Sequence, residues 1–485
     1  MDQAVALATS SPEARNMSRS IIGLLAGAAA LAGCATIPKL PDAPKAAAGD
    51  SFATAQSFQA PQAEWPADRW WVAYGDPQLT GLMDEALAGS PTLAEAAARL
   101  RAAEARAEQS RAATLPSLIG NAQASESKQS YNNGIPAQFV PRGYNDTGRA
   151  SLDLSYDLDL WGRNRAALKA ATSEADAARM DAAEARLALT TAIASAYADF
   201  ARLTAEHDAA DAALKNREAS ADLVAHRVTG GAANPGEADQ ARAAAAAARQ
   251  DLAALDEQLA VVRNQLAALA GQGPDRGLSL GRPKAVPANG FGLPQNLAAD
   301  LLGRRPDLQA ARLRAEAAAK RIDVAKAGFY PNVNLAAFIG VQSLGLNNLT
   351  KSGSDIGQAG AAISLPIFEG GRLQGAYRGA RADYDTAVAA YDQTLVQALQ
   401  QVADAAAGQR ALQARLAAAR DALTSGEQAY RVARLRYEGG LTSYLTLLTA
   451  EDAVIAQRRA VAQLEARALT LDASLVRALG GGFRA

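Results

Sequence analysis

The sequence predicts an α + β membrane protein, in which four transmembrane strands per chain join strands of other copies in one β-barrel that continues into long helices. Three observations predict this fold class: a two-faced strand that runs directly into a very long helix, an internal duplication, and an export signal that ends at a cysteine. The 485 residues are 49% hydrophobic but only 5% aromatic, with alanine dominating the apolar share. This composition favours long, closely packed helices over a thick hydrophobic core.

The N-terminus carries an export signal. Arg15 and Arg19 precede the apolar run IIGLLAGAAALAG, which ends at Cys34, the only cysteine in the sequence. A run this short is typical of a signal peptide and too short for a membrane-spanning helix. The acidic residues near the start do not suit a signal segment, so we expect translation to begin at Met17 and residues 1–33 to be removed. The alternative is an unprocessed, buried thiol.

Four segments alternate between apolar and polar residues with the period of a strand. In the clearest, LDLSYDLDL, leucines and a tyrosine occupy one face and Asp153, Asp157 and Asp159 the other. We expect these aspartates to face the water of the barrel lumen, either to favour cations or only to keep the lumen wet. The four predicted strands lie near residues 117–128, 150–161, 332–342 and 359–368.

About ten alternating residues are enough to cross a bilayer at a tilt, although a soluble sandwich strand has the same pattern. Four strands do not close a barrel, and a lipid-exposed sheet edge is not tolerated. We therefore expect several copies of the chain to share one barrel, and two, three or four copies fit this argument equally well.

The two halves of the sequence repeat at a constant offset of 209 residues, which aligns Gly162-Arg163 with Gly371-Arg372. Matching glycines and arginines over about 110 residues indicate an internal duplication rather than shared composition. After the signal peptide we expect a linker, a first repeat, an equatorial linker, a second repeat and a C-terminal tail, over residues 34–76, 77–271, 272–294, 295–480 and 481–485.

Each strand pair is followed by a long helix, about residues 164–229 and 373–438, with no proline in either. Some sixty-five helical residues extend about 100 Å, far more than a compact domain needs. Shorter helices are expected to pair with them: one ending near Gly271, and others over 443–479, 77–115 and 295–328. The irregular segments between these shorter helices then form a mixed equatorial region at mid-height.

Five motifs together resemble the TolC-type outer-membrane efflux proteins, closest to the lipidated NodT/OprM branch. They are WWVAYGDPQL (70–79), LDLSYDLDLWGR (152–163), LLGRRPDLQAA (301–311), PIFEGGRL (366–373) and RYEGGLTSYLTLLTAED (436–452). The resemblance implies a homotrimer with a twelve-strand barrel in the outer membrane and an α-helical barrel across the periplasm. It also implies a passive exit duct for small molecules that docks on a periplasmic adaptor and an inner-membrane pump, most often of the resistance-nodulation-division (RND) class.

The LAGC ending of the apolar run resembles the lipobox of bacterial lipoproteins. This resemblance implies that Cys34 carries diacylglycerol and N-palmitate and anchors the chain to outer-membrane lipid. Three alternatives remain open: a type I protein-secretion duct, a periplasm-spanning structural lipoprotein, and a periplasmic adaptor.

The resemblance places a periplasmic gate at the tips of the two helical hairpins. Tyr437 matches a family tyrosine, whereas Thr446 and Thr449 stand where the family carries two aspartates. On the first hairpin Glu237 occupies the position of a family acid, and Gln240 follows one turn later. The alternative for the glutamate is stabilisation of a helix N-terminus.

The turns VTGG and YEGG permit the positive φ angles that tight turns require. The resemblance implies that these tips and their flanking arginines contact the adaptor, whereas the arginines on their own would also stabilise helix C-termini. The expected contact residues are Arg227, Gly230, Gly231, Arg436, Gly439 and Gly440.

Other function classes have little support in the sequence. The net charge of −1, with charges interspersed along the helices, argues against nucleic-acid binding. His207 and His226 are the only histidines and lie far apart in sequence, so a catalytic triad or a metal site would lack parts. We expect no enzyme activity, and no cofactor beyond the covalent lipid.

Overall fold

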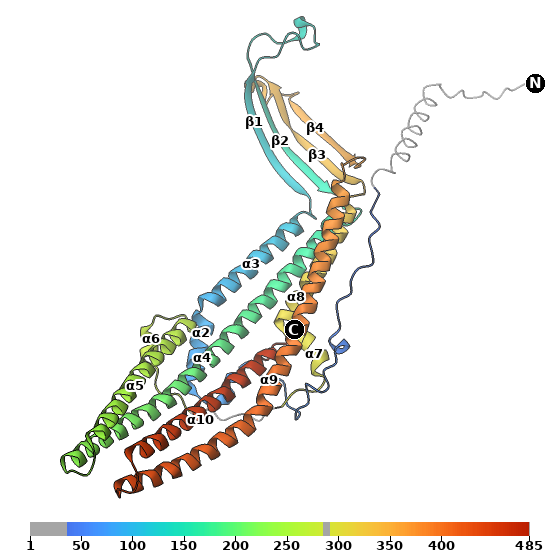
Figure 1. Cartoon of the computed structure of the whole chain (residues 1–485). Helices are drawn as coiled ribbons and strands as arrows, with labels where there is room; N and C mark the ends of the chain where they lie inside the picture. Colours follow the sequence, from blue (N-terminus) through green and yellow to red (C-terminus); the bar gives the residue numbers. More distant parts are fainter. Residues whose placement is uncertain (1–35, 285–291, 485) are drawn as a thin grey trace, which may run out of the picture. The chain divides into compact units, whose positions relative to one another are not determined.

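The computed structural model describes residues 36–284 and 292–484, so the predicted signal peptide and Cys34 lie outside the described residues. The chain divides into two compact units, coloured along the sequence in Figure 1. Among the described residues, the first unit combines 36–45, 102–175 and 313–388, and the second combines 46–101, 176–284, 292–312 and 389–484. None of the described helices is long and apolar enough to cross a membrane.

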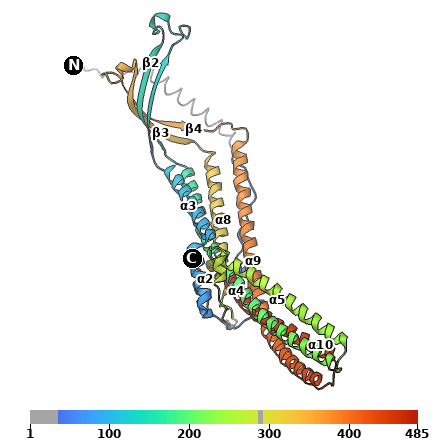
Figure 2. The ribbon, with the colours of Figure 1, turned by 90° about the vertical axis from the view of Figure 1, so that its left-hand side faces the viewer.

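The first unit contains one antiparallel sheet of four strands in the order β1-β2-β3-β4, which Figure 2 shows as a curved ribbon. This confirms the four predicted strands. Two of them lie on the edges of the sheet, and the middle pair joins the two halves of the sequence. The strands are β1 (Ser117–Ser127), β2 (Asn145–Asp157), β3 (Asn332–Leu344) and β4 (Asp355–Ser364).

The register brings Leu118, Leu152, Leu154, Leu335, Ile339 and Ile363 to one face, whereas Ile119 and Phe338 lie on the opposite face beside Asp153. Leu154 pairs with Leu118 on one side and with Ala337 on the other, and Ala337 in turn pairs with Ala359. On the opposite face Asp153 accepts hydrogen bonds from the side chains of Asn121 and Ser151, both at 2.8 Å. One face of the sheet is therefore apolar, as the alternation predicts, and the other carries both polar and apolar side chains.

The prediction that Asp159 is a strand residue facing the lumen is wrong. β2 ends at Asp157, and Asp159 follows it with a positive φ of 46°. Its carboxylate accepts the backbone N–H groups of Asn164 and Arg165, each at 2.9 Å, at the start of the next helix. An acceptor here satisfies donors that have no partner within the helix, so this aspartate caps the helix.

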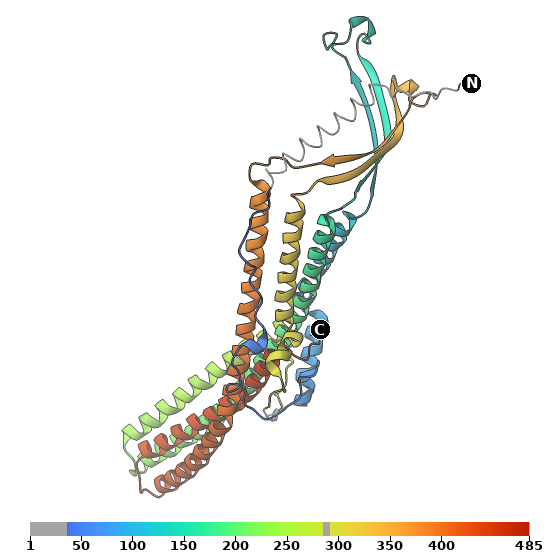
Figure 3. The ribbon, with the colours of Figure 1, turned by 90° about the vertical axis from the view of Figure 1, so that its right-hand side faces the viewer.

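The long helices have the same length in both halves. α4 (Arg163–Thr229) and α9 (Arg372–Glu438) each have 67 residues. α5 (Pro235–Leu269) and α10 (Tyr444–Ala478) each have 35 and run back beside them (Figure 3). Both pairs start 209 residues apart, the offset seen in the sequence.

Two predicted helices are each broken in two. The segment 77–115 forms α2 (Pro77–Gly89) and α3 (Pro91–Ala112), and the segment 295–328 forms α7 (Leu297–Arg304) and α8 (Pro306–Ala327). The residue before each second proline is extended, with ψ of 124° at Ser90 and 119° at Arg305. Proline lacks an N–H and disfavours helical geometry in the preceding residue, which explains both breaks.

The remaining elements are short. They are the α-helix α6 (Asp275–Leu278) and the 3-10 helices η1 (Gly49–Ser51), η2 (Trp70–Tyr74), η3 (Ala137–Phe139) and η4 (Leu346–Asn348).

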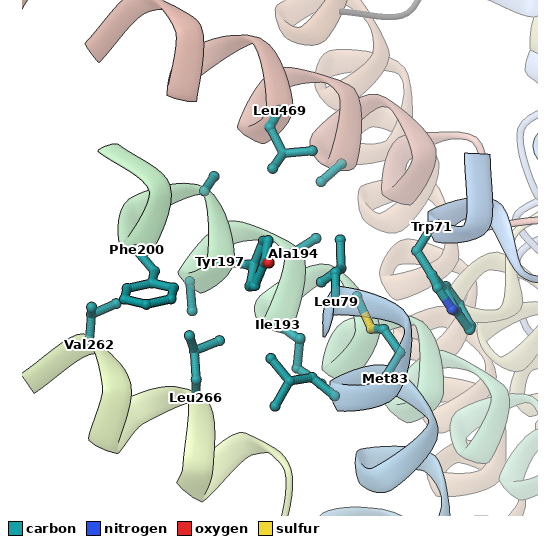
Figure 4. Packing of buried hydrophobic residues seen from close by; sticks show 14 of the residues in the cluster. Trp71, Leu79, Met83, Ile193, Ala194, Tyr197, Phe200, Val262, Leu266 and Leu469 are labelled. Carbon is teal, nitrogen blue, oxygen red and sulfur yellow. The ribbon is translucent and has the colours of Figure 1, made fainter. Parts of the chain in front are cut away.

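The main hydrophobic core lies in the second unit, where η2, α2, α4, α5 and α10 meet (Figure 4). The side chain of Tyr197 is fully buried there and donates a 2.5 Å hydrogen bond to the buried carboxylate of Asp76. The same carboxylate caps α2 by accepting from the backbone N–H of Gln78 at 2.8 Å. Burial raises the pKa of Tyr197, so the phenol remains a donor and fixes α2 against α4.

Candidate functional site at the hairpin tips

Each helical hairpin ends in the same glycine turn. At the first tip the N–H of Ala232 donates to the carbonyl of Arg227 at 2.7 Å, and at the second the N–H of Leu441 donates to the carbonyl of Arg436 at 2.7 Å. This is the Schellman pattern, which requires a left-handed residue. The second glycine of each pair, Gly231 or Gly440, supplies it with φ of 73°. Gly230 and Gly439 do not adopt positive φ.

An apolar cluster joins the two hairpins behind these turns. Tyr437 of α9 and Tyr444 of α10 are 3% and 1% exposed, and their rings meet edge to face with centroids 5.7 Å apart. Burial raises the pKa of Tyr437, so its hydroxyl stays neutral. The buried members of the cluster come from α4, α5, α9 and α10 and are Val224, Ala238, Ala241, Ala433, Tyr437, Tyr444 and Leu447.

Arg227 connects the first hairpin directly to the turn of the second. Its Nη1 donates to the backbone carbonyl of Tyr437 at 2.9 Å, and its guanidinium carbon lies 4.9 Å from the centroid of the Tyr437 ring. The arginine therefore places a cation at the C-terminus of α9, where the helix dipole favours one. Arg436, its counterpart at the same offset, is exposed.

Glu237 lies at the N-terminus of α5, as expected for a glutamate that stabilises a helix N-terminus. Asn234, the N-cap, accepts from the backbone N–H of Glu237 at 3.0 Å, and its side-chain amide approaches the glutamate carboxylate at 3.4 Å. A negative charge in the first turn also complements the helix dipole. Gln240 is exposed one turn further on.

Thr446 and Thr449 are exposed on the first turns of α10. The hydroxyl of Thr449 donates to the carbonyl of Leu445 at 2.9 Å, and that of Thr446 lies 3.3 Å from the hydroxyl of Ser443. Both positions carry neutral hydroxyl groups, so they contribute no charge to the tip.

A buried ionic cluster two to three turns behind the tip was not predicted from the sequence. Arg217 of α4 is 8% exposed, and its Nε lies 3.4 Å from a carboxylate oxygen of Glu451 on α10. The same guanidinium donates to Asp452 and, at 3.4 Å, to the carbonyl of Ala244 on α5. Burial raises the pKa of Glu451, and the arginine opposes that rise.

A pattern in the sequence does point to this cluster. Tyr444, Leu447, Glu451 and Val454 follow the spacing of one helical face, and all four are buried. A carboxylate within an apolar stripe needs a buried partner of opposite charge, so its position predicts an ion pair.

Three other predicted site residues do not belong to the hairpin tips. Asp153 and Asp157 lie on β2 in the first unit, and Cys34 lies outside the described residues. Across residues 36–284 and 292–484, no group of three or more His, Cys, Asp or Glu side chains is arranged to hold a metal ion.

Comparisons with known proteins extend over nearly the whole chain. A profile of the family described as "Outer membrane efflux protein" matches residues 82–272 and 297–481. The fusaric acid resistance protein FusA of Burkholderia cepacia is 38% identical over 64% of this chain, which spans 59% of that relative's length. The multidrug resistance outer membrane protein MdtP of Escherichia coli K12 is 30% identical over 97% of this chain and 98% of the relative.

Solved structures share the fold. The outer membrane protein VceC of Vibrio cholerae is 44% identical with a TM-score of 0.80, and the match covers 87% of this chain and 100% of VceC. The outer-membrane channel OprN is 28% identical with a TM-score of 0.82, and the match covers 93% of this chain and 99% of OprN.

Proposed function

Because the chain belongs to the outer membrane efflux protein family, we propose that it forms the outer-membrane exit channel of a tripartite efflux system for small molecules. Members of this family are channel proteins. The observation that carries the proposal is the four-stranded sheet with one apolar face, whose strands lead into helices of 67 residues. A passive conduit requires no catalytic group, and we propose no enzymatic step.

We propose that three copies assemble one channel. The sheet of a single chain ends in two edge strands, β1 and β4, and backbone N–H and C=O groups along an edge need partners in a membrane. Pairing β1 of one copy with β4 of the next satisfies both edges, and three copies close a barrel of twelve strands.

We propose that the chain is anchored in the outer membrane by lipid on Cys34 as well as by the barrel. Diacylglycerol and N-palmitate on this cysteine would add acyl chains directly before the described segment that begins at residue 36. The two repeats, 77–271 and 295–480, would then each supply two strands and one long hairpin, joined by the linker 272–294.

We propose that the hairpin tips contact a periplasmic adaptor and that an RND-type pump in the inner membrane supplies the driving force. The two tips have matching backbone turns and exposed threonines, which suits contact with another helical hairpin. MdtP and VceC are outer membrane proteins by name, and the names of FusA and MdtP refer to fusaric acid resistance and multidrug resistance. We therefore propose small organic molecules as the cargo class.

Planar-bilayer conductance of the purified, lipidated protein tests the proposal. We expect small, rare openings from the native protein, and larger openings after Tyr437→Gly, which removes a buried ring from the cluster that joins the hairpins. A well-folded trimer that conducts in neither form would contradict the channel and favour a structural lipoprotein. Conductance accompanied by export of a polypeptide in cells would instead identify a protein-secretion duct.

A further inference from the structure

A cavity of about 560 Å³ lies in the first unit between the start of α4 and the end of α8. An aromatic pair forms one side of it. Trp161 stacks on Tyr330 with ring centroids 4.6 Å apart, and its indole N–H donates to the carbonyl of Pro331 at 2.8 Å. Although these contacts fix the indole, it remains 52% exposed. The ring is therefore held in place while one face stays open to the surroundings.

Positive charge surrounds the rest of the cavity. Its lining includes four cationic side chains and one carboxylate: Arg165, Lys169, Lys320, Lys326 and Asp323.

Two of these cations already have partners. Nε of Arg165 lies 3.2 Å from the Asp159 carboxylate, and Nζ of Lys320 lies 3.7 Å from that of Asp323. Lys169 and Lys326 are exposed, and neither forms an ion pair with any residue in the described part of the chain. The cavity thus offers two uncompensated ammonium groups close to a fixed aromatic surface.

The cavity lies at the end of the two central strands. Trp161 follows β2, and Pro331 directly precedes β3, whereas the sheet edges belong to β1 and β4. A neighbouring copy would pair with β1 or β4. Strand pairing between copies therefore does not cover the end of β2 and β3 where the cavity lies. The apolar face of the sheet also ends at this level.

We propose that this cavity binds the anionic phosphodiester headgroup of a phospholipid, with Lys169 and Lys326 on the phosphate and the Trp161–Tyr330 pair beside the glycerol. The inference rests on one part of the proposed function, the placement of the sheet in a membrane, and does not require conduction. Amphipathic Trp and Tyr rings concentrate at the headgroup level, where one side is apolar and the other wet. Lysines near an anionic lipid surface each strengthen binding by about fivefold.

Native mass spectrometry of the purified, full-length protein tests this site. Phosphatidylglycerol and phosphatidylethanolamine are titrated separately, and we expect selective retention of phosphatidylglycerol. The double substitution Lys169→Gln with Lys326→Gln is expected to weaken phosphatidylglycerol binding by about thirtyfold. The matched control, Lys128→Gln with Lys351→Gln, removes the same charge from two exposed lysines in the strand-connecting loops and is expected to bind as the native protein does.

Three results would overturn the inference: equal binding of the two lipids, equal loss in the control variant, or displacement of the lipid by soluble glycerophosphoglycerol at the same concentration. The last would identify an aqueous phosphate site. The variant Lys169→Arg with Lys326→Arg keeps both charges, and we expect it to bind phosphatidylglycerol as the native protein does. This result would show that the glutamine variant binds weakly because it lacks the two charges and not because it misfolds.

Conductance recorded on the same preparation distinguishes this inference from the proposed function. Normal conductance without lipid selectivity would contradict the headgroup site and leave the channel intact. Lipid selectivity that depends on the two lysines, without conductance, would contradict the channel and support the site.

Discussion

Arg227 is the side chain that holds the turn of the second hairpin against the first. Its hydrogen bond to the carbonyl of Tyr437 and its position over the tyrosine ring are both lost in Arg227→Ala. A hydrogen bond from a charged donor is worth about 2 kcal/mol, which corresponds to roughly thirtyfold in an equilibrium constant. In the proposed channel, opening separates the tips, so we expect the ratio of open to closed time to rise by that order in single-channel recordings.

The duplication supplies the control for this experiment. Arg436 occupies the equivalent position 209 residues later but is exposed. We expect Arg436→Ala to leave the open probability near the native value. Equal effects of the two substitutions would show that charge at the tips, rather than the contact with Tyr437, governs opening.

Glu451 makes the packing of the two hairpins depend on pH. Burial raises its pKa above the ordinary 4.5, so just above that pH the folded state binds more protons than the unfolded state. The stability that this residue contributes is complete below pH 4.5 and is lost as the pH rises through the raised value. The protection factors of the α10 amides, which compare each exchange rate with that of an unfolded chain at the same pH, should therefore depend less on pH in Glu451→Gln.

An exposed carboxylate on the same helix provides the comparison for Glu451. Glu465 forms a 2.8 Å ion pair with Arg420 of α9, and its side chain is 52% exposed. We expect Glu465→Gln to retain the native pH dependence. If Glu451→Gln retained it as well, the pH dependence would arise elsewhere in the hairpins.

At the scale of an element, the glycine turns are predicted to differ in their two glycines. Gly440 has φ of 73°, a conformation that costs a residue with a side chain about 1–2 kcal/mol. Gly439 lacks a positive φ, and a Cβ there would come no closer than 3.4 Å to any residue other than its two chain neighbours. We expect Gly440→Ala to speed hydrogen exchange at the tip about tenfold and Gly439→Ala to change it little. Equal effects would mean that loss of flexibility, rather than the left-handed geometry, is responsible.

The regular elements could be predicted from local patterns. The strands follow from a period of two and the long helices from alanine-rich, proline-free sequence, and the structure confirms both. The breaks before Pro91 and Pro306 were missed, although proline chemistry alone explains them. Asp159 was misassigned because the alternation continues for two residues after the pairing of β2 ends. Periodicity records which residues are apolar, but not where the ladder of hydrogen bonds stops.

The side-chain contacts of the candidate site depend on long-range packing. Arg227 and Tyr437 are 210 residues apart in sequence, and their contact exists only because two hairpins pack together. The resemblance placed Tyr437, Glu237 and the glycine turns at the tips, where the structure has them. It could not show that only one of the two matching arginines turns inward. The family prediction itself is confirmed by the comparisons.

For the whole molecule, the edge strands predict how copies associate. One cysteine is introduced in β1 and one in β4 of the chain, in which the proposed lipid would block Cys34, and oxidation should link neighbouring copies. Because the proposed pairing closes a ring of three, we expect covalent species up to trimers on denaturing gels. Leu152→Cys with Ile339→Cys, which are registered partners on β2 and β3, should crosslink only within one chain. A ladder that stopped at dimers would contradict the trimer.

In the proposed ring of three copies, the matching turns also determine which sites a binding partner can contact. Each copy contributes two tips with the same backbone hydrogen bonds, so the ring has six equivalent sites for a partner that contacts only the main chain. Arg227 donates a hydrogen bond to the carbonyl of Tyr437, whereas Arg436 is exposed. This difference divides the six sites into two alternating sets of three. In the proposed trimer the duplication would thus create a pseudo-sixfold axis, and the position of a single arginine would reduce it to threefold symmetry.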